Sequence, residues 1–149
     1  MNYYPIFLDL RSKPVLVIGG GNVALRKVKG LLEAEAQVTV ISPETAHELR
    51  ALPIKILNRV YQTGDCLGHT LIFATTDNRA VNAQIARDAL SLGIPSNIAD
   101  APEECGFIVP ARLAETDLQI AVSTGGTDPR RAVAIRNKIK QMIGSLAQV

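Results

Sequence analysis

Three consecutive glycines, Gly19 to Gly21, lie between an apolar run rich in valine and a segment whose apolar residues have helical spacing. Gly19, Gly21 and Ala24 satisfy the pattern G-x-G-x-x-A. In that pattern the first glycine permits a tight turn, the second lets a pyrophosphate approach the backbone, and the small third residue lets the helix pack closely on a sheet. The motif predicts a strand, a dinucleotide-binding turn and a helix; a glycine turn that serves packing alone is the alternative.

The alternation of strand and helix continues through the first two thirds of the chain. Short apolar runs bounded by Gly, Pro, Asn or Asp are typical of strands buried on both faces of a parallel sheet. We predict such strands at residues 14–18, 37–41, 54–57, 71–75 and 94–98. Helices are predicted over residues 23–34 and 78–92, where one face is apolar. This order predicts an α/β, doubly wound, Rossmann-type parallel sheet that forms an NAD-binding domain over residues 1–100.

The pattern changes in residues 101–149. Residues 107–111 and 118–123 are predicted to be two strands that pair as a hairpin. A glycine-rich turn follows and leads into a helix that begins at Pro129, with Asp128 as its N-cap. About 50 residues bury too little apolar surface to fold alone, so this segment needs the preceding domain or the same segment of a second subunit. We expect it to form a homodimer.

Composition excludes several classes of protein. The 149 residues include 16 Lys and Arg against 14 Asp and Glu, a net charge of +2 that is too balanced for a disordered tail or a general nucleic-acid binder. No apolar run approaches the roughly 20 residues of a membrane span, and the start lacks the features of a signal peptide, so a cytoplasmic protein is expected. Cys66 and Cys105 are expected to be unpaired thiols and His47 and His69 surface residues, with no metal site.

The positive surplus is concentrated in the last predicted helix. No acidic residue follows Asp128, whereas the basic residues there are Arg130, Arg131, Arg136, Lys138 and Lys140. Such a face is either merely solvated or an electrostatic funnel for a polyanionic substrate. Nucleic acid is a polyanion of this kind, but residues 108–149 contain no aromatic side chain that could stack on a base.

Candidate ligand contacts follow two of the predicted strands, because open α/β sheets bind ligands at the carboxyl ends of their strands. They are Ser42, Pro43 and Glu44 after the second strand and Thr75, Thr76 and Asp77 after the fourth. Glu44 is close enough to the strand end to accept ribose hydrogen bonds, and no Arg is there to receive a 2′-phosphate, which favours NAD over NADP. The residues after the fourth strand are expected to cap the next helix, to contact the ligand, or to do both.

Asp100 is the candidate for proton chemistry. It follows the predicted strand 94–98 and precedes Ala101 and Pro102, at the junction between the two parts of the chain. A carboxylate there could accept or donate the proton that moves when a hydride leaves a substrate. The alternative is an aspartate that orders a turn before a proline.

Several stretches of the sequence together resemble one known family. They are YPIFLDL from Tyr4, VIGGGNVALRK from Val17, ATTDN from Ala74, NIADAP from Asn97, FIVP from Phe107 and AVSTGGTDP from Ala121. In this order, and over nearly the whole chain, they are similar to the precorrin-2 dehydrogenase family, which includes the dehydrogenase and ferrochelatase module of sirohaem synthase.

The resemblance implies NAD-dependent oxidation of precorrin-2 to sirohydrochlorin, followed in some members by insertion of ferrous iron. Asp100 matches the aspartate of the family's N-x-x-D-A-P motif, whose proposed role is acid/base work. Asn22 and Val23 match positions that contact NAD, as do Pro43 and Glu44. Three functions are therefore carried forward: the dehydrogenase, a bifunctional dehydrogenase and chelatase, and a non-catalytic NAD-sensing module.

The substrate that the resemblance implies, precorrin-2, is a polycarboxylate, which suits the basic last helix. We expect it to be contacted by Ser123, Thr124, Gly125, Arg130, Arg131 and Arg136. Two departures from the family are visible. Members commonly have a serine where this chain has Asp128, and they usually continue beyond Val149 as a helical domain. From the second departure we expect a site that is open, or is completed by a partner subunit or another protein.

Overall fold

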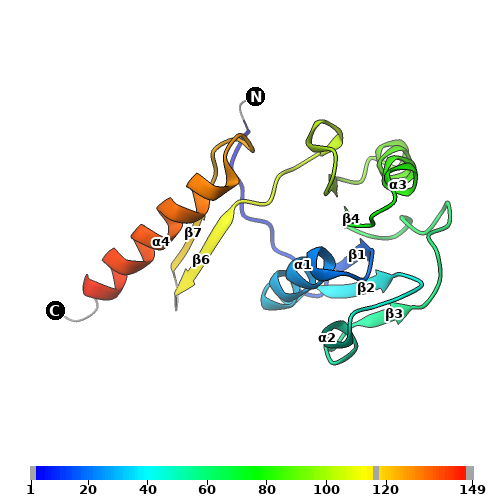
Figure 1. Ribbon diagram of the computed structural model, residues 1–149, viewed down its shortest axis with the longest axis horizontal. Helices are drawn as coiled ribbons and strands as arrows, with labels where there is room; N and C mark the ends of the chain where they lie inside the picture. Colours follow the sequence, from blue (N-terminus) through cyan, green and yellow to red (C-terminus); the bar gives the residue numbers. More distant parts are fainter. Residues whose placement is uncertain (1–2, 116–117, 147–149) are drawn as a thin grey trace. The chain divides into compact units, whose positions relative to one another are not determined.

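The computed structural model describes residues 3–115 and 118–146, which fall into two units (Figure 1). The first unit is Phe7–Phe107, and the second combines Met1–Ile6 with Ile108–Val149. The change of pattern near residue 101 lies inside the first unit, because residues after it still bond to the last strand of its sheet. The Gly106 N–H, for example, donates to the Ser96 carbonyl over 2.8 Å. The functions expected of the two parts stay predictions.

The first unit is built on a five-stranded parallel sheet. Its strands are β1 (Pro14–Ile18), β2 (Gln37–Ile41), β3 (Lys55–Leu57), β4 (Leu71–Ala74) and β5 (Ser96–Ile98). They lie in the order β3-β2-β1-β4-β5. This order confirms the predicted doubly wound sheet, and it reverses direction at β1, whose neighbours are β2 and β4. Such a reversal is where open α/β sheets bind ligands.

Two helices cover opposite faces of this sheet, because successive side chains of a strand point to opposite sides. Val28 of helix α1 (Asn22–Glu33) belongs to one buried cluster with Val15 of β1, and Ile85 of helix α3 (Arg79–Ser91) belongs to another with Leu16 of the same strand. All four side chains are fully buried. The β-branched runs are therefore core on both faces, as their continuous apolar sequence predicts.

A short helix, α2 (His47–Arg50), connects β2 to β3 and was not predicted. It has four residues and buries only Leu49 among them, which is too short a stretch to produce a helical period in the sequence. His47 at its start is exposed, as predicted. His69 is half-buried with a shielded Nδ1 atom, so the surface position predicted for it is only partly right. Cys66 and Cys105 are free thiols, as predicted.

The second unit contains an antiparallel strand pair and one long helix. The elements are β6 (Ala111–Glu115), β7 (Leu118–Val122) and α4 (Pro129–Leu146). The helix and the hairpin confirm the predicted types, and the Arg131 N–H donates to Asp128 Oδ1 over 2.9 Å, which confirms Asp128 as the N-cap. No helix in the described ranges is long and apolar enough to cross a membrane.

The strand predicted over residues 107–111 was wrong. The strand begins at Ala111, after Pro110, which has no N–H to donate to a ladder. Phe107 instead belongs to the first unit, where its ring packs edge-on against Phe73 of β4 with centroids 5.4 Å apart. Its carbonyl accepts a 3.1 Å hydrogen bond from Asn97 Nδ2. The apolar residues that suggested a strand thus include one that completes the core of the parallel sheet.

Candidate functional site

The turn after β1 requires glycine at its first position. Gly19 has φ +120°, a conformation that L side chains rarely adopt, and a β-carbon there would lie 2.6 Å from Thr75 Oγ1. The Thr75 hydroxyl and N–H both bond to the Ile18 carbonyl, at 2.8 and 2.7 Å. The end of β4 is thus pressed against the turn, and the Thr75 hydroxyl serves this packing.

Gly20 also has a role, which the sequence motif did not predict. A β-carbon on Gly20 would lie 2.0 Å from the Glu44 carbonyl oxygen. The same carbonyl accepts a 2.5 Å hydrogen bond from the hydroxyl of Ser42, which is buried. Ser42 therefore holds the loop after β2, whereas Pro43 and the Glu44 side chain are exposed, where a ligand could meet them. The only signal for Gly20 was that the run has three glycines where the motif needs two.

Gly21 is the position that leaves room for a ligand. No described heavy atom lies within 4 Å of a β-carbon built on Gly21, so the space beside its Cα is open. Gly21 is the N-cap of α1 and has no side chain that could cap the helix. It therefore accepts no hydrogen bond through a side chain from the N–H groups of the first turn, such as those of Asn22 and Val23. Free N–H groups and the positive end of the helix dipole suit a phosphate. These residues fit the pyrophosphate of a dinucleotide.

The residues after β4 differ in their surroundings: one is bonded within the fold and one is exposed. Thr76 is half-buried, and its hydroxyl bonds to Asn82 Oδ1 over 2.6 Å. Asp77 is exposed at the same end of the strand. The helix cap expected from residues 75–77 is instead Asn78, whose Oδ1 accepts the N–H groups of the first turn of α3 at 3.0 and 3.2 Å. Asp77 is therefore left available for a ligand.

Asp100 lies just beyond β5 and is held by two donors. Its Oδ1 accepts hydrogen bonds from Asn82 Nδ2 at 2.9 Å and from Arg79 Nη1 at 3.2 Å. Arg79 also pairs with Glu104, and this hydrogen bond is the main reason that the pKa of Arg79 is raised above its ordinary value. The Asp100 side chain is 36% exposed, so it is anchored on one side and reachable on the other. Both features suit a group that exchanges a proton with a ligand.

Asn82 and Arg79 were missed by the sequence analysis. Asn82 is fully buried on α3, in line with the buried Ile85 and Ala89. A polar residue at the buried position of an apolar helix face was the available signal, since buried amides need partners. The amide brings Thr76 and Asp100 together, two residues that the sequence analysis had singled out separately.

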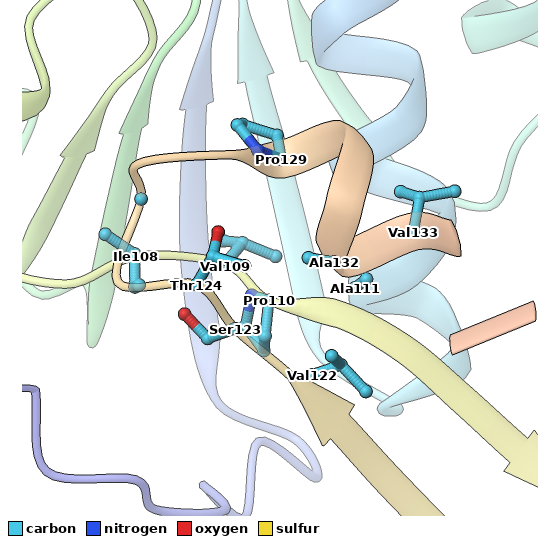
Figure 2. Close-up of a pocket in the computed structure, with 11 residues that line it drawn as sticks. Ile108, Val109, Pro110, Ala111, Val122, Ser123, Thr124, Pro129, Ala132 and Val133 are labelled. Atoms are coloured by element: carbon cyan, nitrogen blue, oxygen red, sulfur yellow. The ribbon is translucent and has the colours of Figure 1, made fainter. Parts of the chain in front are cut away.

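The glycine-rich turn of the second unit is closed by its own hydrogen bonds. The Ser123 hydroxyl accepts from the Gly125 N–H at 3.0 Å, and the Thr124 hydroxyl bonds to both the carbonyl and the N–H of Asp128, at 2.8 and 3.0 Å. Ser123 and Thr124 line a hollow of about 200 Å³. Figure 2 shows its other walls, formed by apolar side chains from the segment that leads into β6, the end of β7 and the first turns of α4.

The three predicted arginines of α4 differ in their surroundings. Arg130 and Arg131 are exposed on the first turn of the helix. Arg136 is half-buried, and its Nη1 donates to the Arg112 carbonyl over 3.0 Å, which ties α4 to β6. The exposed pair is therefore the better placed to receive an anion. The ligand contacts expected of Ser123, Thr124, Gly125 and the arginines stay predictions.

Comparison with known proteins places these features in a family. Residues 6–111 match the family model described as "Putative NAD(P)-binding", and residues 116–142 match that described as "Sirohaem biosynthesis protein central". The siroheme synthase of Methylococcus capsulatus is 44% identical over 97% of this chain and 31% of its own length. That of Thioalkalivibrio sulfidiphilus is 40% identical over 96% of this chain and 30% of its own. The chain spans about a third of the length of these curated relatives.

Among solved structures, the precorrin-2 dehydrogenase SirC superposes with a TM-score of 0.79. It is 26% identical, and the match covers 93% of this chain and 70% of that one. The dinucleotide-binding fold that the glycine motif predicts and the resemblance that the six stretches carry are both confirmed. The match over residues 6–111 shows that the chain belongs to this NAD(P)-binding family, alongside the siroheme synthases and the precorrin-2 dehydrogenase that it resembles.

Proposed function

We propose that this chain catalyses the NAD-dependent dehydrogenation of precorrin-2 to sirohydrochlorin. The observation that carries the proposal is the position of Asp100. Its carboxylate lies beyond β5, half-exposed, and is linked through Asn82 to Thr76 at the end of β4. Strand β4 in turn pairs with β1, which ends in the open glycine turn. A proton-exchanging group and a dinucleotide-binding turn therefore belong to the same edge of one sheet.

The glycine turn would hold the cofactor. The space beside Gly21 and the N–H groups of Asn22 and Val23 would receive the pyrophosphate. The exposed Glu44 side chain would accept hydrogen bonds from the ribose, which supports NAD over NADP. When bound, NAD supplies a hydride acceptor.

Asp100 would handle the proton of the reaction. Dehydrogenation removes one hydride and one proton from the substrate, so a base must take the proton as the hydride leaves. The Asp100 carboxylate accepts hydrogen bonds from Asn82 and Arg79, which hold it in place. It would accept the proton and release it to solvent through its exposed side.

The second unit would meet the polycarboxylate substrate. Arg130 and Arg131 are exposed at the start of α4, next to the turn that contains Ser123 and Thr124. No acidic residue follows Asp128, so the helix presents a positive field to an anion.

The second unit would also form a homodimer. Among its described residues only Leu113 and Ala132 are buried apolar side chains, whereas Leu118 and Val133 are 41% and 42% exposed. A hairpin and one helix with so small a core need further apolar burial. Sedimentation of the purified chain tests this: a dimer at micromolar concentration is expected, and a monomer that keeps its fold would refute it. The cytoplasmic location stays a prediction.

A turnover assay tests the activity. The purified chain is mixed with precorrin-2 and NAD, and the absorbance of NADH and of sirohydrochlorin is followed. Asp100→Ala should lower the rate by about 10²-fold or more and leave NAD affinity nearly unchanged. Glu103→Gln, an exposed carboxyl nearby, is the matched control and should keep the wild-type rate. Stoichiometric NAD binding without turnover by the wild type would support the NAD-sensing module instead.

A further inference from the structure

The side chain of Asn82 uses its whole hydrogen-bonding capacity on two partners. Its Nδ2 donates to the Thr76 carbonyl and to Asp100 Oδ1, both at 2.9 Å. Its Oδ1 accepts from the Thr76 hydroxyl at 2.6 Å and from the Thr76 N–H at 3.3 Å. A side-chain amide can donate two hydrogen bonds and accept two, so Asn82 has no unused donor or acceptor. Asn82 itself is completely shielded from solvent.

A buried amide with all its bonds made is held in one orientation. Rotating the Asn82 amide by half a turn would place its oxygen against Asp100 Oδ1 and the Thr76 carbonyl and its NH₂ group against the Thr76 N–H, so at least three of the four hydrogen bonds would be lost. An unpaired buried polar group costs about 1–3 kcal/mol, so this rotation is strongly disfavoured. Asn82 therefore holds the Asp100 carboxylate in a defined orientation relative to the end of β4.

Arg79 holds the same carboxylate differently. It lies near the surface with its side chain 46% exposed, and it divides its guanidinium between Asp100 and Glu104. An exposed ion pair of this kind is screened by solvent and weakly directional. Arg79 thus contributes a positive charge beside the Asp100 carboxylate, whereas Asn82 fixes the orientation of that carboxylate.

We infer that Asn82 is a positioning residue for the reaction: it fixes the Asp100 carboxylate relative to the cofactor-binding end of β4 and keeps that carboxylate a hydrogen-bond acceptor. The inference rests on the proposed function, in which Asp100 takes the substrate's proton.

Asn82→Asp is the sharpest test, because it keeps the size of the side chain and the acceptor for Thr76. It replaces the donor that faces Asp100 with a second carboxyl group. Two carboxyl groups in hydrogen-bond contact share a proton. The acid limb of the kcat profile is therefore expected to move to higher pH by about one unit or more, with kcat near neutral pH lowered about tenfold. The KM for NAD should change by less than about threefold, since Thr76 keeps its acceptor.

The same assay separates this inference from the proposed function. If the wild type turns over precorrin-2 and Asn82→Asp has the wild-type pH profile, the positioning role is wrong and the dehydrogenase stands. In the Asp100→Ala background, Asn82→Asp should lower the rate no further. A further tenfold loss there would show that Asn82 acts independently of Asp100 and would overturn the inference.

A measurement without turnover keeps the inference testable if Asn82→Asp does not fold or the wild type proves inactive. In ¹⁵N-labelled protein, the side-chain amide resonances of Asn82 are expected to shift on Asp100→Ala, which removes the acceptor, and to stay unchanged on the control Glu103→Gln. Unshifted Asn82 resonances in Asp100→Ala would refute the contact and, with it, the positioning role. If the wild type is inactive but the Asn82 resonances shift on Asp100→Ala, the contact between Asn82 and Asp100 is supported and the proposed reaction is wrong.

Discussion

A β-carbon on Gly20 would lie 2.0 Å from the carbonyl oxygen of Glu44, so the turn after β1 and the loop after β2 are in direct backbone contact. The Gly20 carbonyl also accepts the Ala46 N–H over 2.8 Å. The two segments that would hold the pyrophosphate and the ribose of a dinucleotide therefore form one surface, and its shape depends on the absence of a side chain at Gly20.

Gly20→Ala should destabilise the fold. The obstructing atom is main chain and cannot swing aside, so the loop after β2 must shift; overpacking of this kind costs about 1–3 kcal/mol. Urea denaturation gives the free energy of unfolding. Gly21→Ala is the control: its β-carbon meets open space and its φ of −91° suits alanine, so a change within about 0.5 kcal/mol is expected. Equal losses in both variants would contradict the close contact.

Gly21→Ala should instead weaken cofactor binding. The open space beside Gly21 is the room that a pyrophosphate would need, and a methyl group would occupy part of it. The dissociation constant for NAD, measured by calorimetry, is expected to rise about tenfold or more, a loss of about 1.4 kcal/mol. Lys29→Ala, on the exposed side of α1, should leave it unchanged. If Gly21→Ala binds NAD with the wild-type affinity, the pyrophosphate does not bind beside Gly21.

The ion pair of Arg59 and Asp65 should make stability depend on pH. Arg59 donates two hydrogen bonds to Asp65, at 2.7 and 2.8 Å, and this contact is the main reason that the pKa of Asp65 lies below its ordinary value of 3.8. Because the folded pKa is the lower one, the stabilisation is fully present above the unfolded pKa and is lost as pH falls through the folded one.

Asp65→Asn should therefore be less stable than the wild type near pH 7, and the difference should shrink as the pH falls below the ordinary value of 3.8. Urea denaturation at several pH values measures it. Asp9→Asn removes an exposed pair with Arg11 and is expected to change stability little at any pH, since solvent screens such pairs. A difference between wild type and Asp65→Asn that does not vary with pH would sink the prediction.

Reversing the charge of Arg130 and Arg131 should weaken binding of the polycarboxylate. The double change to Glu is expected to raise the KM for precorrin-2 about tenfold at low salt, and less at high salt where charges are screened. NAD affinity should not change. The double change of Lys29 and Lys55 to Glu, at exposed cations of α1 and β3, is the matched control for net charge. An equal rise in KM in both variants would indicate a general charge effect with no site on α4.

The parallel sheet could be predicted because its information is local. The predicted strands 14–18 and 37–41 coincide with β1 and β2, whose Val and Ile side chains are buried whichever element packs on them. Gly19 could be predicted for the same reason, since the turn conformation belongs to the residue itself.

The parts that were missed depend on contacts between distant segments. The obstruction at Gly20 comes from the carbonyl of Glu44, and the bond from Asn82 reaches Asp100 across 18 residues, so neither leaves a local pattern. The strand predicted over 107–111 failed similarly, because Phe107 packs on Phe73, a residue of a strand far earlier in the chain. Asp100 could be predicted because ligand-binding groups lie at the carboxyl ends of strands. Its hydrogen-bond partners, Asn82 and Arg79, could not be predicted in this way.

The contact between Gly20 and Glu44 limits how the cofactor preference of this chain could be redesigned. Grafting a longer segment after β2 would move main chain toward the glycine turn and disturb the turn that would hold the pyrophosphate. Replacement of the exposed side chains at Pro43 and Glu44 leaves that backbone where it is. Engineering should therefore succeed by exchanging side chains at constant loop length.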